Sequence, residues 1–380
     1  FLTNIGYLKS MISVTQSEKL NKIFESWFFT FSTVFGLAGN FLNLVIVNRV
    51  RHNILVISTM VFFLAGFVYT ASVVRISTTA GVYFFLFTIP TILNGCSPIM
   101  ITGLYKDAGY ISFICFIFLN AGQSFSGLLL ATIKLLLIKF PITKTVADVV
   151  TTDEDKTAFL YFSITIGMLI IAIILYVVII NTSRYKKKKR AREKSNVETV
   201  SKPLKQQFIC YYLIFKNKWI DGLTIYLNMT ITLFIFPVLL LKVESTSTNL
   251  EWIKYFTVFN TFFAFALGDF ISRYIYMFLK WPRPGTIWMI IFASLRVLFL
   301  FLFFFCNNQL KTGFPTIFKH DVFPILFVFL FGLTGGHLIT IVFSVPYSLE
   351  TIEKQVDCSS LFVLLLGFGL ASGSLLSWVF

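Results

Sequence analysis

Residues 158–194 have the sequence AFLYFSITIGMLIIAIILYVVII followed by NTSRYKKKKRAREK. The first part, residues 158–180, contains no charged side chain. At about 1.5 Å per helical residue, such a run is long enough to cross the ~30 Å hydrocarbon core of a bilayer. The second part is rich in lysine and arginine, which accumulate at the cytoplasmic ends of transmembrane helices. This stretch predicts a membrane-spanning helix that ends at a basic loop.

The whole chain has the composition of a membrane protein. Of its 380 residues, 57% are hydrophobic and 13% are charged, whereas an ordinary soluble domain carries about 25% charged residues. The abundance of apolar side chains also excludes a disordered chain. The five cysteines lack Cys-x-x-Cys spacing and the three histidines are scattered, so we expect no disulfide framework, metal site or other cofactor.

Apolar windows separated by charged or turn-rich breaks predict the transmembrane helices. They lie at Ser26–Val47, Ile54–Val74, Gly81–Leu104, Ser112–Ile138, Ala158–Ile180, Ile220–Leu241, Trp252–Leu279, Thr286–Cys306, Val322–Val345 and Ser359–Phe380. The apolar run Phe1–Leu8 is too short to span and lacks the basic segment of a signal peptide. We interpret it as the end of a first helix truncated at its N-terminus. The predicted fold is therefore an all-α polytopic membrane protein with eleven transmembrane helices.

The net charge of +15 is concentrated in one loop. The segment from Asn181 to Lys218 contains twelve lysines and arginines and two glutamates, which accounts for +10 of that charge. A basic loop between apolar helices is typical of the cytoplasmic side, where Arg184–Arg192 would meet anionic lipid headgroups. We expect no nucleic-acid partner, because no stacking or groove-reading element accompanies the charge.

The basic loop follows the sixth helix and divides the chain. We predict a six-helix bundle at 1–180 with an incomplete first helix, a basic cytoplasmic loop at 181–219 and a five-helix bundle at 220–380. The C-terminus then lies on the side opposite the loop, and this orientation depends on the one loop. Within it, Lys205–Trp219 interleaves aromatic residues with lysines, which favours an interfacial helix; a solvated linker is the alternative.

Two ionisable residues inside the eighth predicted helix are the best pointers to function, because charges at membrane depth are expensive. Asp269 and Arg273 are four residues apart, so they lie on one helical face where their charges can meet. Together they offer a polar ligand both acceptors and donors. The alternative is an ion pair that only locks helix packing.

Three further polar residues in the spans have open interpretations. Arg296 snorkels to the surface, caps a neighbouring helix or contacts a ligand directly. Asn94 places an amide in the fourth span, where hydrogen bonding between helices is the alternative to ligand contact. His337 is a ligand donor, a proton site or a buried polar residue. We interpret the glycines of the spans as close-packing positions, among them Gly122, Gly127, Gly332, Gly335, Gly336, Gly367, Gly369 and Gly373.

The segment around the charged pair resembles the equilibrative nucleoside transporter family. The family pattern in helix eight is Phe-Asn-x-x-Asp-x-x-Gly-Arg, and residues 265–273 have the sequence FALGDFISR. Asp269 and Arg273 are kept, whereas Ala266 and Ser272 replace the asparagine and the glycine.

Other segments are similar to the same family in the same order. Residues 296–307 resemble its Arg-x-x-Phe-x-Pro…Cys-Asn segment, with Phe301 in place of the proline, and residues 331–338 resemble its Phe-x-x-x-Asn-Gly-Tyr-Leu segment. The likeness is continuous over 220–380 and patchy before it.

The resemblance implies a 6+5 major-facilitator-like arrangement and transport of nucleosides, and of nucleobases as a second class, by alternating access. It implies that Asp269 accepts from ribose hydroxyls, that Arg273 orients this carboxylate, that Asn94 contacts the base edge and that Leu2 and Leu370 form apolar walls. The candidate substrate-binding residues are Asp269, Arg273, Asn94, Leu2, Leu370 and His337.

Two other functions remain open at this point. The same fold could transport an organic cation attracted by Asp269, or the chain could be a non-transport membrane receptor or scaffold. We do not expect an enzyme, because the sequence contains no His-Glu-x-x-His, Gly-x-Ser-x-Gly or phosphate-loop motif. The expected location is the plasma membrane.

Overall fold

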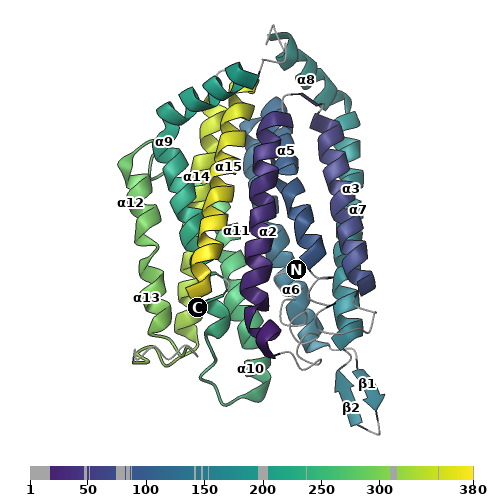
Figure 1. Ribbon diagram of the computed structural model, residues 1–380, viewed down its shortest axis with the longest axis vertical. Helices are drawn as coiled ribbons and strands as arrows, with labels where there is room; N and C mark the ends of the chain where they lie inside the picture. Colours follow the sequence, from purple (N-terminus) through teal and green to yellow (C-terminus); the bar gives the residue numbers. More distant parts are fainter. Residues whose placement is uncertain are drawn as a thin grey trace.

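The computed structural model describes residues 18–46, 49–50, 52–73, 82, 86, 88–140, 143–146, 149–152, 154–195, 204–236, 238–308, 315–349 and 351–379. These residues form a bundle of long helices that stand side by side (Figure 1). Leu2 and the predicted helix end Phe1–Leu8 lie outside the described residues.

The first helix group comprises the long helices before the basic loop, on the right of Figure 1. Its elements are α2 (Glu18–Ile46), α3 (His52–Val73), the 3-10 helix η2 (Ile89–Cys96), α5 (Ser97–Ile111), α6 (Phe113–Lys139) and α7 (Glu154–Asn181). A short antiparallel hairpin, β1 (Thr143–Val146) and β2 (Val149–Thr152), connects α6 to α7 and was not predicted. The short helix α8 (Ser183–Ser195) follows α7 after one bend.

The second helix group comprises everything from α9 onward. Its elements are α9 (Leu204–Ile235), η3 (Leu240–Lys242), α10 (Leu250–Thr257), the π-helix η4 (Val258–Phe263), α11 (Ala264–Phe278), α12 (Ile287–Leu295), α13 (Leu298–Phe304), α14 (Val322–Ser344), η5 (Val345–Ser348), α15 (Ile352–Leu376) and η6 (Ser377–Val379). The π-helix joins α10 to α11 without a break, so the three form one span.

Within the described part of the chain, nine helices are long and apolar enough to cross a membrane. This confirms the helical membrane fold, while the count of eleven stays a prediction. The span predicted at Gly81–Leu104 differs most: η2 is followed by α5, which continues to Ile111. The helix tolerates Asp107 because this carboxylate is buried and accepts hydrogen bonds from the hydroxyls of Tyr176 (2.8 Å) and Tyr185 (2.5 Å).

The last helix begins earlier than predicted for a similar reason. We expected the last span at Ser359–Phe380, but α15 begins at Ile352. Asp357 is buried inside the helix, where it accepts a hydrogen bond from the Cys210 thiol at 3.6 Å. At Asp107 and at Asp357 alike, the fold supplies a donor and the helix continues past the carboxylate.

Glycines bring α11 and α14 into backbone contact. A Cβ at Gly268 would overlap the Phe329 carbonyl oxygen, and one at Gly332 would overlap the Phe265 carbonyl oxygen. Because only glycine permits this approach, the seam fixes the depth of α11 relative to α14. The sequence predicted such packing.

The other glycines do not all act alike. Gly369 and Gly373 pack in the same way against the backbone of α9, at the Tyr226 and Thr230 carbonyl oxygens, which confirms that prediction. A Cβ at Gly122 would contact no other part of the described chain, so the packing interpretation was wrong there.

The two helix groups meet mainly at two places: α2 and α5 pack against α15, and α6 packs against η4 and α11. Figure 1 shows α2 and α15 side by side at the centre of the molecule. The candidate site lies on the second of these contacts.

The basic loop is more helical than predicted. Residues 183–195 form α8, and α9 begins at Leu204 and bends at Lys218, where the backbone leaves helical geometry (φ −125°, ψ 26°). The Tyr185 side chain is buried and Lys188 Nζ donates to the Ile111 carbonyl at 3.1 Å. These contacts dock α8 on the end of α5.

We expect Gly332→Ala to destabilise the protein by about 1–3 kcal/mol, because the added methyl forces α11 and α14 apart. The control is Gly167→Ala in α7, where a Cβ meets no neighbouring atom; the higher helix propensity of alanine should raise stability by up to about 1 kcal/mol. Thermal unfolding in detergent measures both. Equal midpoints would contradict a glycine-dependent seam.

Asp321, just before α14, fastens the loop between η3 and α10. Its carboxylate accepts from the Thr246 backbone N–H (2.8 Å), the Trp252 indole N–H (2.7 Å) and the Ser245 hydroxyl. Partial burial alone would raise the pKa of Asp321, but these hydrogen bonds outweigh burial and hold the pKa below its usual range.

A lowered folded-state pKa gives stability that is present above the unfolded pKa of about 3.9 and lost as pH falls through the folded value. We therefore expect Asp321→Asn to lower the unfolding midpoint at pH 7 and the difference from wild type to shrink below about pH 4. The exposed Glu251→Gln on α10 is the control. A difference that is independent of pH would exclude the carboxylate as its source.

Candidate functional site

Asp269 and Arg273 form an ion pair on one face of α11. Arg273 Nη2 donates to Asp269 Oδ1 at 2.9 Å and to Oδ2 at 3.2 Å. The Arg273 side chain is 4% exposed and the Asp269 side chain 18%. The predicted pairing is confirmed, and the carboxylate is the more accessible partner.

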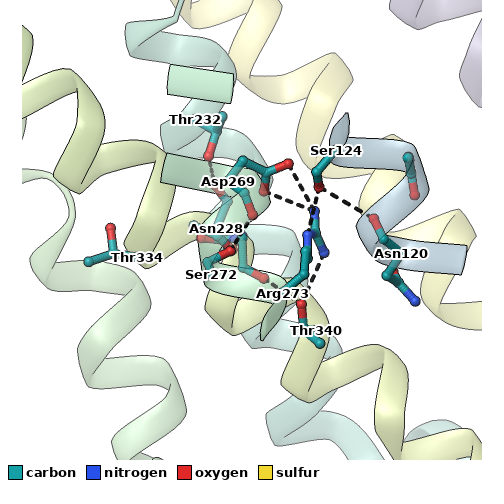
Figure 2. Close-up of polar contacts among 12 residues, drawn as sticks. Asn120, Ser124, Asn228, Thr232, Asp269, Ser272, Arg273, Thr334 and Thr340 are labelled. Atoms are coloured by element: carbon teal, nitrogen blue, oxygen red, sulfur yellow. Dashed lines mark hydrogen bonds and ion pairs between the residues drawn. The ribbon is translucent and has the colours of Figure 1, made fainter. Parts of the chain in front are cut away.

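Arg273 also reaches two other helices (Figure 2). Its Nε donates to the Ser124 hydroxyl on α6 at 2.8 Å, and its Nη1 donates to the Thr340 hydroxyl on α14 at 3.1 Å. The guanidinium therefore connects α6 of the first helix group to α11 and α14 of the second. A charge-assisted network at this position links the site to the relative placement of the two groups.

A row of polar side chains continues from Ser124 into α5. The Ser124 hydroxyl donates to the Asn120 carbonyl at 3.4 Å, and Asn120 Oδ1 accepts from the Tyr105 hydroxyl at 3.1 Å. Tyr105, Asn120 and Ser124 are all buried. They give Arg273 a polar surrounding on the side of the first helix group.

Two adjacent glycines of α14 make room for the charged groups. A Cβ at Gly336 would overlap the Asp269 carboxylate and the Ser272 hydroxyl, and one at Gly335 would lie 2.6 Å from Arg296 Nη2. The Asp269 carboxylate also interacts electrostatically with Arg296. Among the described residues, one carboxylate thus lies near two guanidinium groups.

Arg296 is a structural residue in this arrangement. Its side chain is 2% exposed; Nη1 donates to Thr232 Oγ1 at 2.8 Å and to the Asn228 side chain, and Nη2 donates to the Phe331 carbonyl at 3.0 Å. The guanidinium carbon lies 4.2 Å from the centre of the Phe331 ring. Snorkelling to the surface is therefore excluded: Arg296 ties the α12–α13 junction to α9 and α14.

The Asn94 side chain bonds to α2. It belongs to η2, and its Nδ2 donates to the Ser32 carbonyl at 3.0 Å and to the Ser32 hydroxyl at 3.1 Å. This amide joins η2 to α2, which is the helix–helix bond that the sequence left open.

The remaining candidates are dispersed. His337 Nε2 forms a hydrogen bond with the Trp281 carbonyl at 2.9 Å, so the ring faces the loop after α11. Leu370 is half-buried against the hydrophobic cluster that joins α5, α9, α14 and α15. Leu2 lies outside the described residues.

Sequence reasoning missed Ser124 and Thr340, the two hydroxyls that complete the Arg273 network. Their signal is weak, because serine and threonine in a membrane helix commonly bond to their own backbone, as Thr340 also does with the Gly336 carbonyl. Asn40 and Asn43 on α2 were missed as well, although two buried amides inside one span are visible in the sequence.

We expect Ser124→Ala to lower the unfolding midpoint, because a buried guanidinium N–H left without an acceptor costs about 1–3 kcal/mol. The matched control is Ser126→Ala, whose exposed hydroxyl donates to the Gln123 carbonyl of its own helix. If the two variants unfold at the same temperature, Arg273 does not join the helix groups through Ser124.

Comparison with known proteins identifies the family of the chain. A family model described as "Nucleoside transporter" matches residues 91–380. Equilibrative nucleoside transporter 2 of Homo sapiens is 27% identical over 170 residues, which cover 44% of this chain and 37% of that protein. Equilibrative nucleoside transporter 1 of Mus musculus is 22% identical over 378 residues, which cover 91% of this chain and 79% of that protein.

Two solved transporters show a similar fold. The E. coli Fucose:proton symporter FucP superposes with a TM-score of 0.54 at 11% identity, covering 100% of this chain and 92% of that one. The nucleoside transporter NupG superposes with a TM-score of 0.51 at 15% identity, covering 98% and 88%. These likenesses confirm the predicted fold class. Because the family model spans well over half of the sequence, the chain belongs to the nucleoside transporter family.

Proposed function

We propose that this protein is a facilitative transporter of nucleosides, and of nucleobases as a second class, that works by alternating access. The observation that carries the proposal is the placement of Arg273, which bonds to Ser124 on one helix group and to Asp269 and Thr340 on the other. A polar site at the junction of two helix groups changes its surroundings whenever the groups rock.

The chemistry of the pair suits a nucleoside. Ribose hydroxyls would donate to the partly exposed Asp269 carboxylate, and Arg273 would hold this carboxylate and donate to ribose or base. The amide oxygen of Asn94 is the proposed acceptor at the base edge, and Leu2 and Leu370 are the proposed apolar walls. His337, one turn from Thr340 on α14, is the proposed contact toward the Trp281 loop.

The moving units in this proposal are residues 1–180 and 220–380, joined by the basic loop 181–219. We place that loop, Asn181–Lys218, on the cytoplasmic side of the plasma membrane and the C-terminus on the opposite side. The cations of Arg184–Arg192 would then contact anionic headgroups. In support, most of their side chains that the structure describes are exposed.

An organic cation is the less suitable substrate. The Asp269 carboxylate is already paired with Arg273 and interacts with Arg296. A cationic ligand would have to compete with both guanidinium groups, whereas a neutral ligand with hydroxyls and carbonyls can use donors and acceptors together.

We expect Asp269→Asn and Arg273→Lys each to lower the initial rate of labelled nucleoside uptake into proteoliposomes by about 10- to 100-fold. This corresponds to the loss of a hydrogen bond to a charged group, about 1.5–3 kcal/mol. The matched control is Arg283→Lys in the exposed loop before α12. Normal uptake by both site variants would refute the proposed site.

Competition identifies the substrate class in the same assay. Unlabelled nucleosides and nucleobases should reduce uptake, and quaternary ammonium compounds should not. Competition by the ammonium compounds alone would establish the cation transporter instead. If no solute moves or exchanges in reconstituted wild-type vesicles, the protein is a receptor or scaffold and the transport proposal fails.

A further inference from the structure

The first part of α9, residues 204–218, precedes a bend in this helix. We name it the entry segment. It ends at Lys218, where the backbone leaves helical geometry. Figure 1 shows this segment lying obliquely across the top of the bundle before the helix turns downward between its neighbours.

The inner face of the entry segment is attached to the first helix group. Gln207 Nε2 and the Tyr211 hydroxyl both donate to the carbonyl oxygen of Leu44, at 2.8 Å and 3.1 Å. Both side chains are buried. Leu44 lies in the last turn of α2, where helix carbonyls have no partner within the helix. Two residues of α9, within the loop 181–219, thus cap a helix of the first group.

The same face is attached to α15. Cys210 contacts Asp357 through its thiol, and Tyr211 packs in one hydrophobic cluster with Leu44 and Leu364. Because α2 and α15 pack together across the two helix groups, the entry segment closes the end of that contact on the side of the basic loop.

The opposite face of the entry segment is apolar and uncovered. Its side chains are between 42% and 64% exposed: Phe208, Ile209, Tyr212, Leu213 and Phe215, followed by Trp219 at 47%. A contiguous exposed apolar face marks an interaction surface. Lys205 and Lys216 lie on the same exposed side, and aromatic residues interleaved with lysine suit the boundary between acyl chains and anionic headgroups.

We propose that the entry segment is a latch held at the membrane surface: its apolar face binds the anionic phospholipid interface, while Gln207 and Tyr211 fasten it to α2 and Cys210 and Tyr211 fasten it to α15. The basic-loop side of the protein then opens only when these side chains release the Leu44 carbonyl. The opening step rests on the alternating-access function proposed above, whereas the latch and its lipid contact exist without substrate.

The latch is tested by the distance between spin labels at Val50, after α2, and Lys354, in the first turn of α15, two exposed positions. Labels carried on p-acetylphenylalanine leave the native cysteines in place. In substrate-free protein in nanodiscs, we expect Gln207→Ala and Tyr211→Phe to shift the distance distribution toward longer values. Tyr212→Phe, the adjacent tyrosine on the outer face, should leave it unchanged.

An unchanged distribution in the conservative Tyr211→Phe variant, with the wild-type unfolding midpoint, would overturn the latch. A shift of equal size in Tyr212→Phe would overturn it too, because the effect would then not depend on the Leu44 carbonyl. Neither measurement involves transport, so a failed uptake assay and a failed latch remain distinguishable.

The lipid contact is tested by the accessibility of a spin label at Tyr212 in vesicles containing phosphatidylglycerol. We expect oxygen to relax this label more than a water-soluble nickel complex does. A label at the exposed Ile174 on α7 is the lipid reference and one at the exposed Arg190 on α8 is the water reference. Accessibility equal to that at Arg190 would show that the face lies in water and would overturn the lipid contact.

Discussion

A guanidinium group buried inside a membrane bundle must have its charge and its donors satisfied by the protein, because the lipid offers neither water nor counterions. Arg273 meets this requirement with partners from three helices, and only Asp269 belongs to its own helix. The Arg273 guanidinium therefore keeps its hydrogen-bond partners only while α6 holds this position relative to α11 and α14. Function at such a site is inseparable from helix packing.

The glycines of α14 provide the space that this arrangement of charged side chains needs. Gly332 brings the backbones of α11 and α14 together, and Gly335 and Gly336 leave space where Arg296 and Asp269 need it. One short segment thus sets both the helix contact and the shape of the polar site. Arg296 also lies beside this segment, but its N–H groups donate to backbone and side-chain acceptors of α9 and α14. Its role is therefore structural, unlike that of Arg273.

Most of the spans and the Asp269–Arg273 pair were predictable, because apolar length and i, i+4 spacing depend only on local sequence. The helix ends at Asp107 and Asp357 were not, since a carboxylate is tolerated only if distant donors such as Tyr176 or Cys210 reach it. Ser124 was not predictable either: its hydroxyl resembles many others until the fold brings Arg273 beside it.

The π-helix η4 has a consequence for comparisons with relatives. A π-helix closes its hydrogen bonds over five residues instead of four, so Val258–Phe263 holds about one residue more than an α-helix would need for the same rotation. Losing one residue here would return the stretch to α-helical geometry and leave both the orientation of α10 and the register of Asp269 and Arg273 intact. A sequence gap in this stretch would therefore mark the loss of the π-helix rather than a change in the polar centre.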